Sequence, residues 1–321
     1  MLEAMPNRSG AIDLVRIIAV AAIVAGHVFT RDATGDLLYT WHVAVFFILS
    51  GYLWKPHRSL RIELSRRLRS LGRPYLAGFV ILTVALLLQG FEDTGQRILG
   101  GLYGGGVAGM PYITFWFITT LFFTALLLRL IEPLPLAVQW AVGVVGAIAG
   151  WIWGSVLSDT PLGIGLAVTC LVYLLIGDAL RRVRARIRMP LLTGILLILI
   201  SAVLIMTGLS DFIDIKQGDY GTPVVSLLVS VAISFGMILV AESLVRPGMF
   251  SQVCTLLALP LLTVVLLHPV VLWTTWPDPV AFAVGMLVPL AIGLVALRTP
   301  LSPWLTGQER LRRPPAERVA G

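Results

Sequence analysis

The sequence predicts an all-α integral membrane protein with about ten transmembrane helices. Three observations support this prediction: 57% of the 321 residues are hydrophobic, only 13% are charged, and the mean hydropathy is +0.91. Soluble domains are typically about a quarter charged, and a helix needs about 20 mostly apolar residues to cross a bilayer. Stretches of that kind recur from residue 12 to residue 298. The chain is therefore expected to be polytopic, with no appended soluble catalytic domain.

Apolar stretches separated by polar or proline- and glycine-containing breaks define the predicted helices in order. They cover residues 12–30, 37–54, 74–90, 114–131, 136–157, 161–180, 190–209, 223–241, 254–274 and 279–298. The first is interpreted as a spanning helix and not as a signal peptide, because Asp13 and Arg16 interrupt its apolar core. Residues 1–10 then form a short N-terminal segment and 11–298 the transmembrane domain. Pro and Arg in residues 299–321 predict a disordered cytoplasmic tail.

The distribution of Lys and Arg predicts the orientation of these helices. With the N-terminus inside, 20 of the 24 Lys and Arg residues fall in or next to cytoplasmic segments, as the positive-inside rule requires. Arg31, Arg97 and Lys216 fall outside, together with nine acidic residues. An even number of helices places both termini in the cytoplasm. The net charge of +7 is therefore expected to serve topology and contacts with membrane lipids, and not nucleic-acid binding.

Ionisable side chains inside the predicted spans are few, and each costs roughly 2.5–3.5 kcal/mol to insert. The first helix carries Asp13, Arg16 and His27. The last two are eleven residues apart, which is three turns plus about 20°, with a rise of about 16 Å. They therefore share one face and are expected to line a polar track, with Asp13 placed to hold the guanidinium. The alternatives are an arginine that reaches the inner headgroups and a hydrated interfacial histidine.

The next two predicted helices add a series of short motifs. These are Asp13-x-x-Arg16, Arg16-x10-His27, Trp41-His42, Phe46-Phe47-x-x-Ser50-Gly51-Tyr52-Leu53, a basic stretch that ends in Arg73-Pro74-Tyr75, and Trp116-Phe117-Ile118. In this order and hydropathic context the set resembles the membrane-bound acyltransferase 3 family, close to its sugar O-acetylases. The resemblance covers nearly the whole chain. The extra helix and hydrolase-like domain of the best-known members have no counterpart, so the membrane domain or a protein partner is expected to handle the acceptor.

The resemblance implies an acyltransferase of the bacterial cytoplasmic membrane. It would transfer an acyl group, expected to be acetyl, from cytoplasmic acyl-CoA to a hydroxyl of an extracytoplasmic or lipid-linked carbohydrate. Acyl-CoA is then a co-substrate, and neither a bound cofactor nor a metal is expected. A neutral alcohol needs a base to attack a thioester, and histidine, with an ordinary pKa near 6.5, suits that role. We assign it to His27, and we expect Arg16 to bind the pantetheine carbonyls, a phosphate or the developing charge on the thioester oxygen.

Further residues are expected to support the catalytic pair, namely Asp13, His42 and Ser50. A serine followed by glycine also fits an acyl-enzyme nucleophile, whereas helix packing explains the pair without any chemistry. His27, His42 and His268 all fall in the outer third of the membrane in this topology, so a metal site built from three histidines is a further alternative. No acidic ligand is spaced with them, and the resemblance implies no metal.

The basic stretch 55–73 is expected to form a cytoplasmic loop that binds the phosphates of acyl-CoA, with Arg73, Arg69 and Arg66 as the candidates. The positive-inside bias alone is the alternative explanation for these residues. Tryptophans near helix ends fit an aromatic belt and can also stack on a sugar ring. The candidate contacts to the acceptor are Trp41, Trp116 and His268.

Two other functional classes compete with an acyltransferase. A transporter or flippase would use buried Arg, Asp and His as substrate or proton sites, and it often has two similar halves with broken helices in matching places. Here the unusual residues gather in the first three predicted helices, which disfavours that class. An assembly subunit without chemistry would tolerate replacement of the polar membrane residues.

Overall fold

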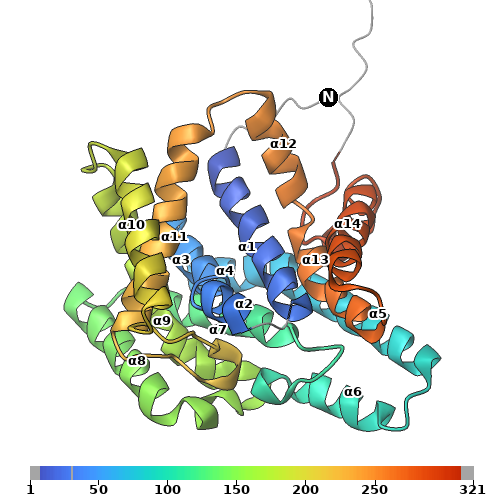
Figure 1. Cartoon of the computed structure of the whole chain (residues 1–321). Helices are drawn as coiled ribbons and strands as arrows, with labels where there is room; N and C mark the ends of the chain where they lie inside the picture. The colour runs from blue at the N-terminus through green and yellow to red at the C-terminus, as the bar shows by residue number, and fades with distance from the viewer. Residues whose placement is uncertain (1–7, 30–31, 312–321) are drawn as a thin grey trace, which may run out of the picture.

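The computed structural model describes residues 8–29 and 32–311 as a helical bundle (Figure 1). Within these residues the regular structure is helical apart from one isolated bridge between Asp214 and Asp219. In the described part of the chain, seven helices are long and apolar enough to cross a membrane: Gly10–Val28, Leu60–Gln89, Leu136–Ser158, Pro161–Arg184, Val225–Leu244, Met249–Trp273 and Asp278–Ala296. Shorter apolar helices, 37–52, 115–131 and 190–206, coincide with the other predicted spans. The all-α membrane class is confirmed, while the count of ten crossings and the cytoplasmic termini stay predictions.

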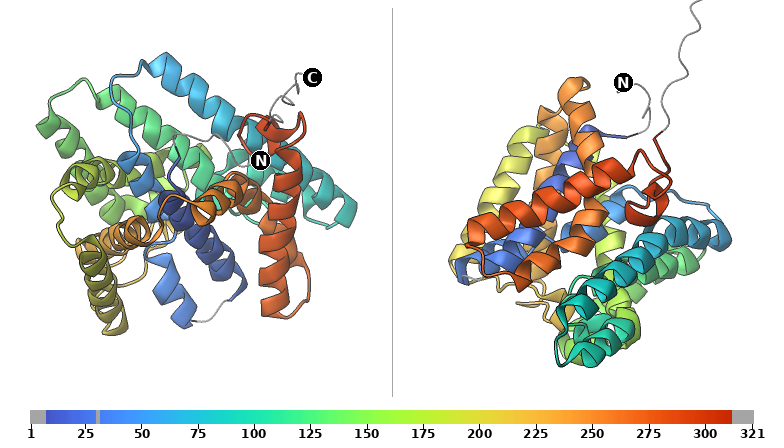
Figure 2. Two further views of the ribbon diagram at one scale, coloured as in Figure 1. Left: turned by 90° about the horizontal axis from the view of Figure 1, so that it is seen from above. Right: turned by 90° about the vertical axis from the view of Figure 1, so that its right-hand side faces the viewer.

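Helix α1 (Gly10–Val28) lies in the middle of the bundle and is apolar on almost every side. It packs against α11 (Val225–Leu244), α12 (Met249–Ala258), α13 (Leu261–Leu267) and α14 (Asp278–Ala296), as the views in Figures 1 and 2 show. A helix that is hydrophobic all round is stable only when other elements cover it. The polar residues of α1 are therefore held inside the protein by its neighbours.

The second predicted helix is two helices, α2 (Asp32–Tyr39) and α3 (Ala44–Tyr52), with a turn between them. Side chains of the turn bond to carbonyls at the end of α2: Trp41 Nε1 donates to Leu37 O at 2.8 Å, and His42 Nδ1 lies 2.7 Å from Leu38 O. The Leu38 carbonyl also accepts the backbone N–H groups of Trp41 and His42, so the His42 ring is a further donor to a carbonyl at the helix end. The turn thereby fixes the direction in which His42 points.

The basic stretch 55–73 is largely helical, which corrects the expectation of a loop. A nearly continuous helix runs through α4 (Leu60–Arg67), a π-helical segment (Leu68–Gly72) and α5 (Arg73–Gln89). Ser59 caps its start, with Oγ accepting a hydrogen bond from Ile62 N at 3.3 Å. Serine at this position satisfies one of the free amide groups of the first turn, and sequence hydropathy cannot register that contribution.

The ninth predicted helix is broken. Helix α12 ends before Pro260, α13 follows, and a 3₁₀ segment covers His268–Trp273. Proline lacks the amide that would continue the helical ladder, so each proline interrupts it. His268 Nδ1 lies 2.9 Å from Val264 O, which also accepts the backbone N–H of His268, while the carbonyl of Val265, four residues before Pro269, accepts a hydrogen bond from Thr114 Oγ1 at 2.9 Å. The break places an imidazole inside the bundle in a fixed orientation.

The remaining elements complete the bundle. The helices are α6 (Thr94–Tyr103), α7 (Phe115–Ile131), α8 (Leu136–Ser158), α9 (Ile164–Arg184), α10 (Pro190–Met206) and α15 (Ser302–Leu305), with 3₁₀ turns at Gly105–Val107, Pro161–Gly163 and Ile215–Gln217. Helix α15 differs from the disordered tail expected from residue 299. Thr263 Oγ1 donates to Leu305 O at 2.8 Å, so this segment is bound to α13. The last part of the predicted tail, 312–321, lies outside the described residues.

Helices α3 and α9 cross at close range because each presents a glycine to the backbone of the other. A methyl group added at Gly51 would overlap the carbonyl of Leu174, and one added at Gly177 would overlap the carbonyl of Ile48. Small residues allow such close approach between membrane helices, where van der Waals contact is the main source of attraction. This crossing fixes α3, and with it the turn that carries His42.

We predict that Gly177→Ala lowers the stability of the folded protein by roughly 1–3 kcal/mol, because the added methyl group forces the two helices apart. Gly95→Ala is the matched control, since Gly95 is an exposed helical glycine with open space around it. The control is expected to be neutral or more stable by about 0.5–1 kcal/mol. Thermal unfolding of both purified variants in detergent measures the difference, and equal melting temperatures would contradict the close-crossing interpretation.

Candidate active site

Two histidines from distant parts of the chain meet where α1 ends. His27 Nδ1, in the last turn of α1, lies 2.9 Å from His268 Nε2, at the start of the 3₁₀ segment that follows α13. The two rings are stacked with their centres 5.1 Å apart. His268 is fully buried, whereas His27 is only partly buried. The structure thus brings together two residues to which the sequence assigned separate roles.

The hydrogen bonds determine which ring nitrogens carry protons. The carbonyl of Val264 can only accept, so Nδ1 of His268 must donate to it. In a neutral ring Nε2 of His268 is then an acceptor, and His27 Nδ1 must be the donor in the contact between the two rings. This leaves Nε2 of His27 without a proton. His268 therefore orients His27 and leaves it able to accept a proton at a defined atom.

A pocket of about 120 Å³ opens beside His27. His42 and Trp116 also line it, from the turn before α3 and from the first turn of α7. Because Nδ1 of His42 is turned to the Leu38 carbonyl, its Nε2 is the nitrogen left to accept a hydrogen bond from a ligand. The remaining polar side chains of the lining are Tyr39, Thr114, Asp214, Lys216 and Gln217. The pocket therefore combines two imidazoles, an indole and a charged loop.

The charged loop, residues 207–224, connects α10 to α11 and covers the pocket with its 3₁₀ turn. Burial is the main cause of two pKa shifts in this loop. It lowers the pKa of Lys216 and raises the pKa of Asp214. Neither residue was singled out from the sequence as a site residue. Only the fold brings this loop to the pocket that His27 lines, so no local pattern could have identified them.

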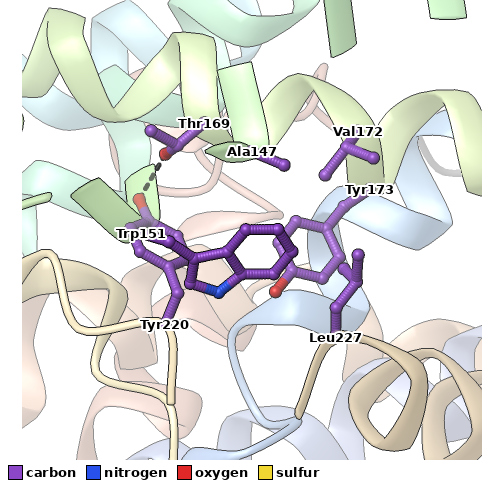
Figure 3. Close-up of a pocket in the computed structure, with 7 residues that line it drawn as sticks. All are labelled: Ala147, Trp151, Thr169, Val172, Tyr173, Tyr220 and Leu227. Carbon is purple, nitrogen blue, oxygen red and sulfur yellow. Dashed lines mark hydrogen bonds between the residues drawn. The ribbon is translucent and has the colours of Figure 1, made fainter. Parts of the chain in front are cut away.

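A second, smaller cavity lies behind this loop and is shown in Figure 3. Its volume is about 10 Å³, which is about the size that one water molecule needs. In it Tyr220 forms a hydrogen bond with Thr169 of α9, beside the rings of Trp151 and Tyr173. The cavity is too small for a substrate. The hydrogen bond between Tyr220 and Thr169 anchors the C-terminal part of the charged loop.

Arg16 lies apart from the pocket. Its Nη1 donates to Asp13 Oδ1 at 2.7 Å, which confirms the predicted contact, and Arg8 binds the same carboxylate at 2.9 Å. The pocket extends along α1 from His27 to Ile23 and does not include Arg16. Between them Val20 is buried, with 1% of its surface exposed. The polar track expected between the arginine and the histidine is therefore interrupted by apolar packing.

At the other end of α3 lies a buried ionic cluster that the sequence analysis missed. Glu63, 1% exposed, accepts a hydrogen bond from Arg67 Nε at 2.8 Å, and Arg129 Nη2 lies 3.7 Å from its other oxygen. Arg67 Nη2 donates to Ser50 Oγ at 3.1 Å, and Arg129 lies over the ring of Trp54. A guanidinium cannot accept a proton, so this contact gives Ser50 no base. The spacing of Glu63 and Arg67 by four residues was the available signal.

The arginines proposed from the sequence for acyl-CoA lie around this cluster. Arg66 and Arg69 are exposed, and Arg66 also binds Glu63 at 3.1 Å. Arg73 is partly buried beside Trp304, with its Cζ 5.9 Å from the ring centre. All three are thus available at one end of the bundle, while the buried Arg67 holds the helix that carries them.

The other proposed residues fall in different places. Trp116 lines the pocket, whereas Trp41 is buried with its indole nitrogen bound to a backbone carbonyl. His268 stands behind His27 and so supports it without lining the pocket. Among the residues that the structure describes, no three side chains of His, Cys, Asp or Glu form a group that could hold a metal ion.

A comparison with protein families identifies the class of this protein. A family model described as an acyltransferase domain, that of acyltransferase 3, matches residues 9–306. This range covers all but the two ends of the chain, so the protein belongs to the acyltransferase 3 family. No curated protein and no solved structure matched the chain. Together with the apolar helices, the family defines a membrane acyltransferase.

We predict that Arg67→Met destabilises the protein by roughly 3–5 kcal/mol, because it leaves the buried Glu63 carboxylate without its closest partner. Arg66→Met is the matched control: it removes a second arginine from the same carboxylate, but one that is exposed. Its expected cost is about 0–1 kcal/mol. Thermal unfolding in detergent measures both, and similar losses would show that burial does not govern the cluster.

We predict that His268→Leu lowers the initial rate of acyl transfer at least roughly tenfold, because His27 loses the acceptor that orients its ring. His268→Gln should retain more activity, since the amide oxygen can accept the same hydrogen bond. Comparing turnover with the Michaelis constant for the acceptor separates orientation of the base from binding. The idea is wrong if the leucine and glutamine variants fold equally well and have equal turnover.

Proposed function

We propose that the protein transfers an acetyl group from acetyl-CoA on the cytoplasmic side to a hydroxyl of a carbohydrate, free or lipid-linked, on the opposite side of the bacterial cytoplasmic membrane. The observation that supports this most is the unprotonated Nε2 of His27 at the edge of a polar pocket, with Nδ1 held by His268. A base with this geometry is what the attack of an alcohol on a thioester requires.

In the proposed reaction His27 Nε2 takes the proton of the acceptor hydroxyl while its oxygen attacks the thioester carbonyl carbon. His27 then carries a proton on both nitrogens, and its Nδ1 proton stays in the hydrogen bond to His268. As the tetrahedral intermediate collapses, the carbon–sulfur bond breaks and His27 returns the proton from Nε2 to the CoA sulfur. The products are the acetyl ester and free CoA, and His27 is restored. His268 is a positioning residue in this scheme.

Arg16 acts on the donor at a distance from the reacting carbon. It lies about 16 Å along the helix from His27, a span that its side chain cannot bridge. We therefore favour contact with the pantetheine arm or a phosphate over contact with the thioester oxygen. Arg66, Arg69 and Arg73 are proposed to bind the nucleotide phosphates at the same end of the bundle. Guanidinium groups bind phosphate oxygens through paired hydrogen bonds, and phosphates cannot enter hydrocarbon without such partners.

The acceptor is proposed to occupy the pocket at the opposite end. Trp116 offers a flat apolar surface there, on which a sugar ring can stack. His42 offers a ring nitrogen that can accept a hydrogen bond from a sugar hydroxyl. These two contacts would orient the reacting hydroxyl toward His27, which lines the same pocket. The pocket thus has a surface for stacking, a hydrogen-bond acceptor for a sugar hydroxyl and a base for the reacting hydroxyl.

We predict that His27→Ala lowers acetyl transfer by roughly 100-fold or more, since general base catalysis contributes about 10²–10⁴-fold. Arg16→Ala is expected to raise the Michaelis constant for acetyl-CoA more than it lowers turnover, because it contacts the donor away from the reacting carbon. The assay supplies labelled acetyl-CoA to membranes that contain each variant, and it follows both CoA release and label in surface carbohydrate.

Arg97→Ala serves as the control, because Arg97 is a partly buried residue that pairs with Asp93 and lies outside the pocket. It should leave the rate unchanged. Melting temperatures of the purified variants separate loss of chemistry from loss of folding. Equal labelling by wild type and His27→Ala would remove the proposed role of His27, and movement of a solute without CoA release would favour a transporter.

A further inference from the structure

Lys216 is the cation of the pocket lining, and its ammonium group is not used by the fold. It lies on the 3₁₀ turn Ile215–Gln217 of the loop that covers the pocket, and it is partly buried. Among the side chains that the structure describes, no carboxylate forms an ion pair with it and no group hydrogen-bonds to it. A partly buried charge without such a partner loses hydration and gains no compensating contact. Lysine at this place therefore points to a role outside stability.

The three carboxylates of the same loop are bound to the loop itself. Asp214 Oδ1 accepts from Gln217 N at 3.3 Å, Asp219 Oδ1 accepts from Gly221 N at 2.9 Å, and Asp211 Oδ2 accepts from Thr222 Oγ1 at 3.0 Å. Asp214 also lines the pocket, and its charge acts favourably on Lys216 without forming an ion pair. The acidic groups of the loop thus accept hydrogen bonds from the loop itself. The ammonium group keeps three donors for a ligand.

The loop is fixed in place, so the position of Lys216 is defined. Gly218, with φ of 72°, packs against Gly154 of α8 so closely that a side chain on either would overlap the backbone of the other. Tyr220 is bound to Thr169 of α9, and Ser226 Oγ of α11 donates to Asp211 O at 2.7 Å. Contacts to three different helices therefore hold the segment that carries Lys216. A rigid, desolvated cation is a better recognition element than a mobile one.

The position of the loop favours contact with the acceptor over contact with the donor. The loop covers the end of α1 that carries His27, whereas Arg8, Arg16 and the cluster around Glu63 mark the opposite end, where we place the donor phosphates. The buried Val20 separates these two regions along α1. A ligand group that reaches Lys216 thus belongs to the molecule that occupies the outer pocket.

We propose that Lys216 binds an anionic substituent of the acceptor, a carboxylate or a phosphate, so that the enzyme acylates acidic carbohydrates in preference to neutral ones. This inference rests on the proposed function. A charge-assisted hydrogen bond in a partly desolvated pocket is stronger than a neutral one and penalises a ligand that leaves the ammonium without a partner. The substituent must lie close to the hydroxyl that faces His27, because both groups line one small pocket.

The test uses three probes that differ only at carbon 6 of the sugar: methyl glucopyranoside, methyl glucopyranosiduronic acid and methyl glucopyranoside 6-phosphate. Purified full-length wild type, Lys216→Gln and Lys216→Arg are compared in nanodiscs. Binding is measured first, without a donor, as the shift of the melting temperature with probe concentration. Acetyl transfer and CoA release from acetyl-CoA are then measured with each probe.

Wild type should bind at least one acidic probe roughly tenfold more tightly than the neutral probe, and transfer should show the same preference. Lys216→Gln should lose that preference with little change for the neutral probe, and Lys216→Arg should keep most of it. Arg97→Gln removes a positive charge outside the pocket and should keep the preference in full. The carboxylate and phosphate probes show which anion is preferred.

Two results would overturn the inference: equal affinity of wild type for acidic and neutral probes, or a preference that persists in Lys216→Gln. An equal loss of turnover in Lys216→Gln with all three probes would also contradict it, because it would indicate a role in the chemical step. Binding of acidic probes that depends on Lys216 in the absence of any CoA release would support the anion site while contradicting the proposed acetyl transfer. The two failures are therefore distinguishable.

Discussion

The hydrogen-bonded chain from the carbonyl of Val264 through His268 to His27 is the interaction on which the candidate active site depends. It lies where Pro269 interrupts the helix, at the start of the 3₁₀ segment His268–Trp273. The imidazole of His268 donates from Nδ1 to the Val264 carbonyl, which also accepts the backbone N–H of His268, and this leaves Nε2 to hold His27. His268, at the break in one helix, thus orients His27 on another helix, 241 positions away in sequence. The turn before α3 uses a similar arrangement: His42 Nδ1 bonds to the Leu38 carbonyl, which also accepts backbone N–H groups, and Trp41 Nε1 donates to Leu37 O.

The opposite end of the bundle contains the buried ionic cluster around Glu63. Glu63 is buried, and several arginines surround it, of which Arg67 and Arg129 are themselves buried. Because the arginines outnumber the carboxylate, the cluster has an excess of positive charge, and the exposed Arg66 and Arg69 extend it to the surface. Such an excess suits an anionic ligand, while the buried pairs hold the helix in position. The proposed recognition of a phosphate and the stability of α4 therefore depend on neighbouring residues with different exposure.

The sequence predicted the helical membrane class and the Asp13–Arg16 contact because both follow from local spacing and hydropathy, while the role of His27 stays a prediction. It could not predict that His268 would bind His27, since their encounter depends on how two helices pack. Lys216 was missed for a similar reason: in the sequence it is one basic residue among the acidic residues of a loop, and only the fold brings it to the pocket. The basic stretch was assigned to a loop because hydropathy does not detect a serine cap or ion pairs along a helix. Charge patterns thus identified the candidate regions. Tertiary contacts determine which side chains of those regions line the pocket.

The separation between the two ends of α1 bears on how an acyl group reaches His27. Phosphates are too costly to bury without partners, so in the proposed reaction the nucleotide part of the donor stays where the arginines lie. The pantetheine arm is narrow and uncharged, and it can pass between helices at far lower cost. In the present structure the route along α1 is closed by Val20 and narrowed by Ile23, both of which are buried. The barrier along this face of α1 is therefore a short apolar constriction between a cationic end and a polar pocket, and a donor that displaces these side chains would exclude water from the path as it extends its thioester toward His27.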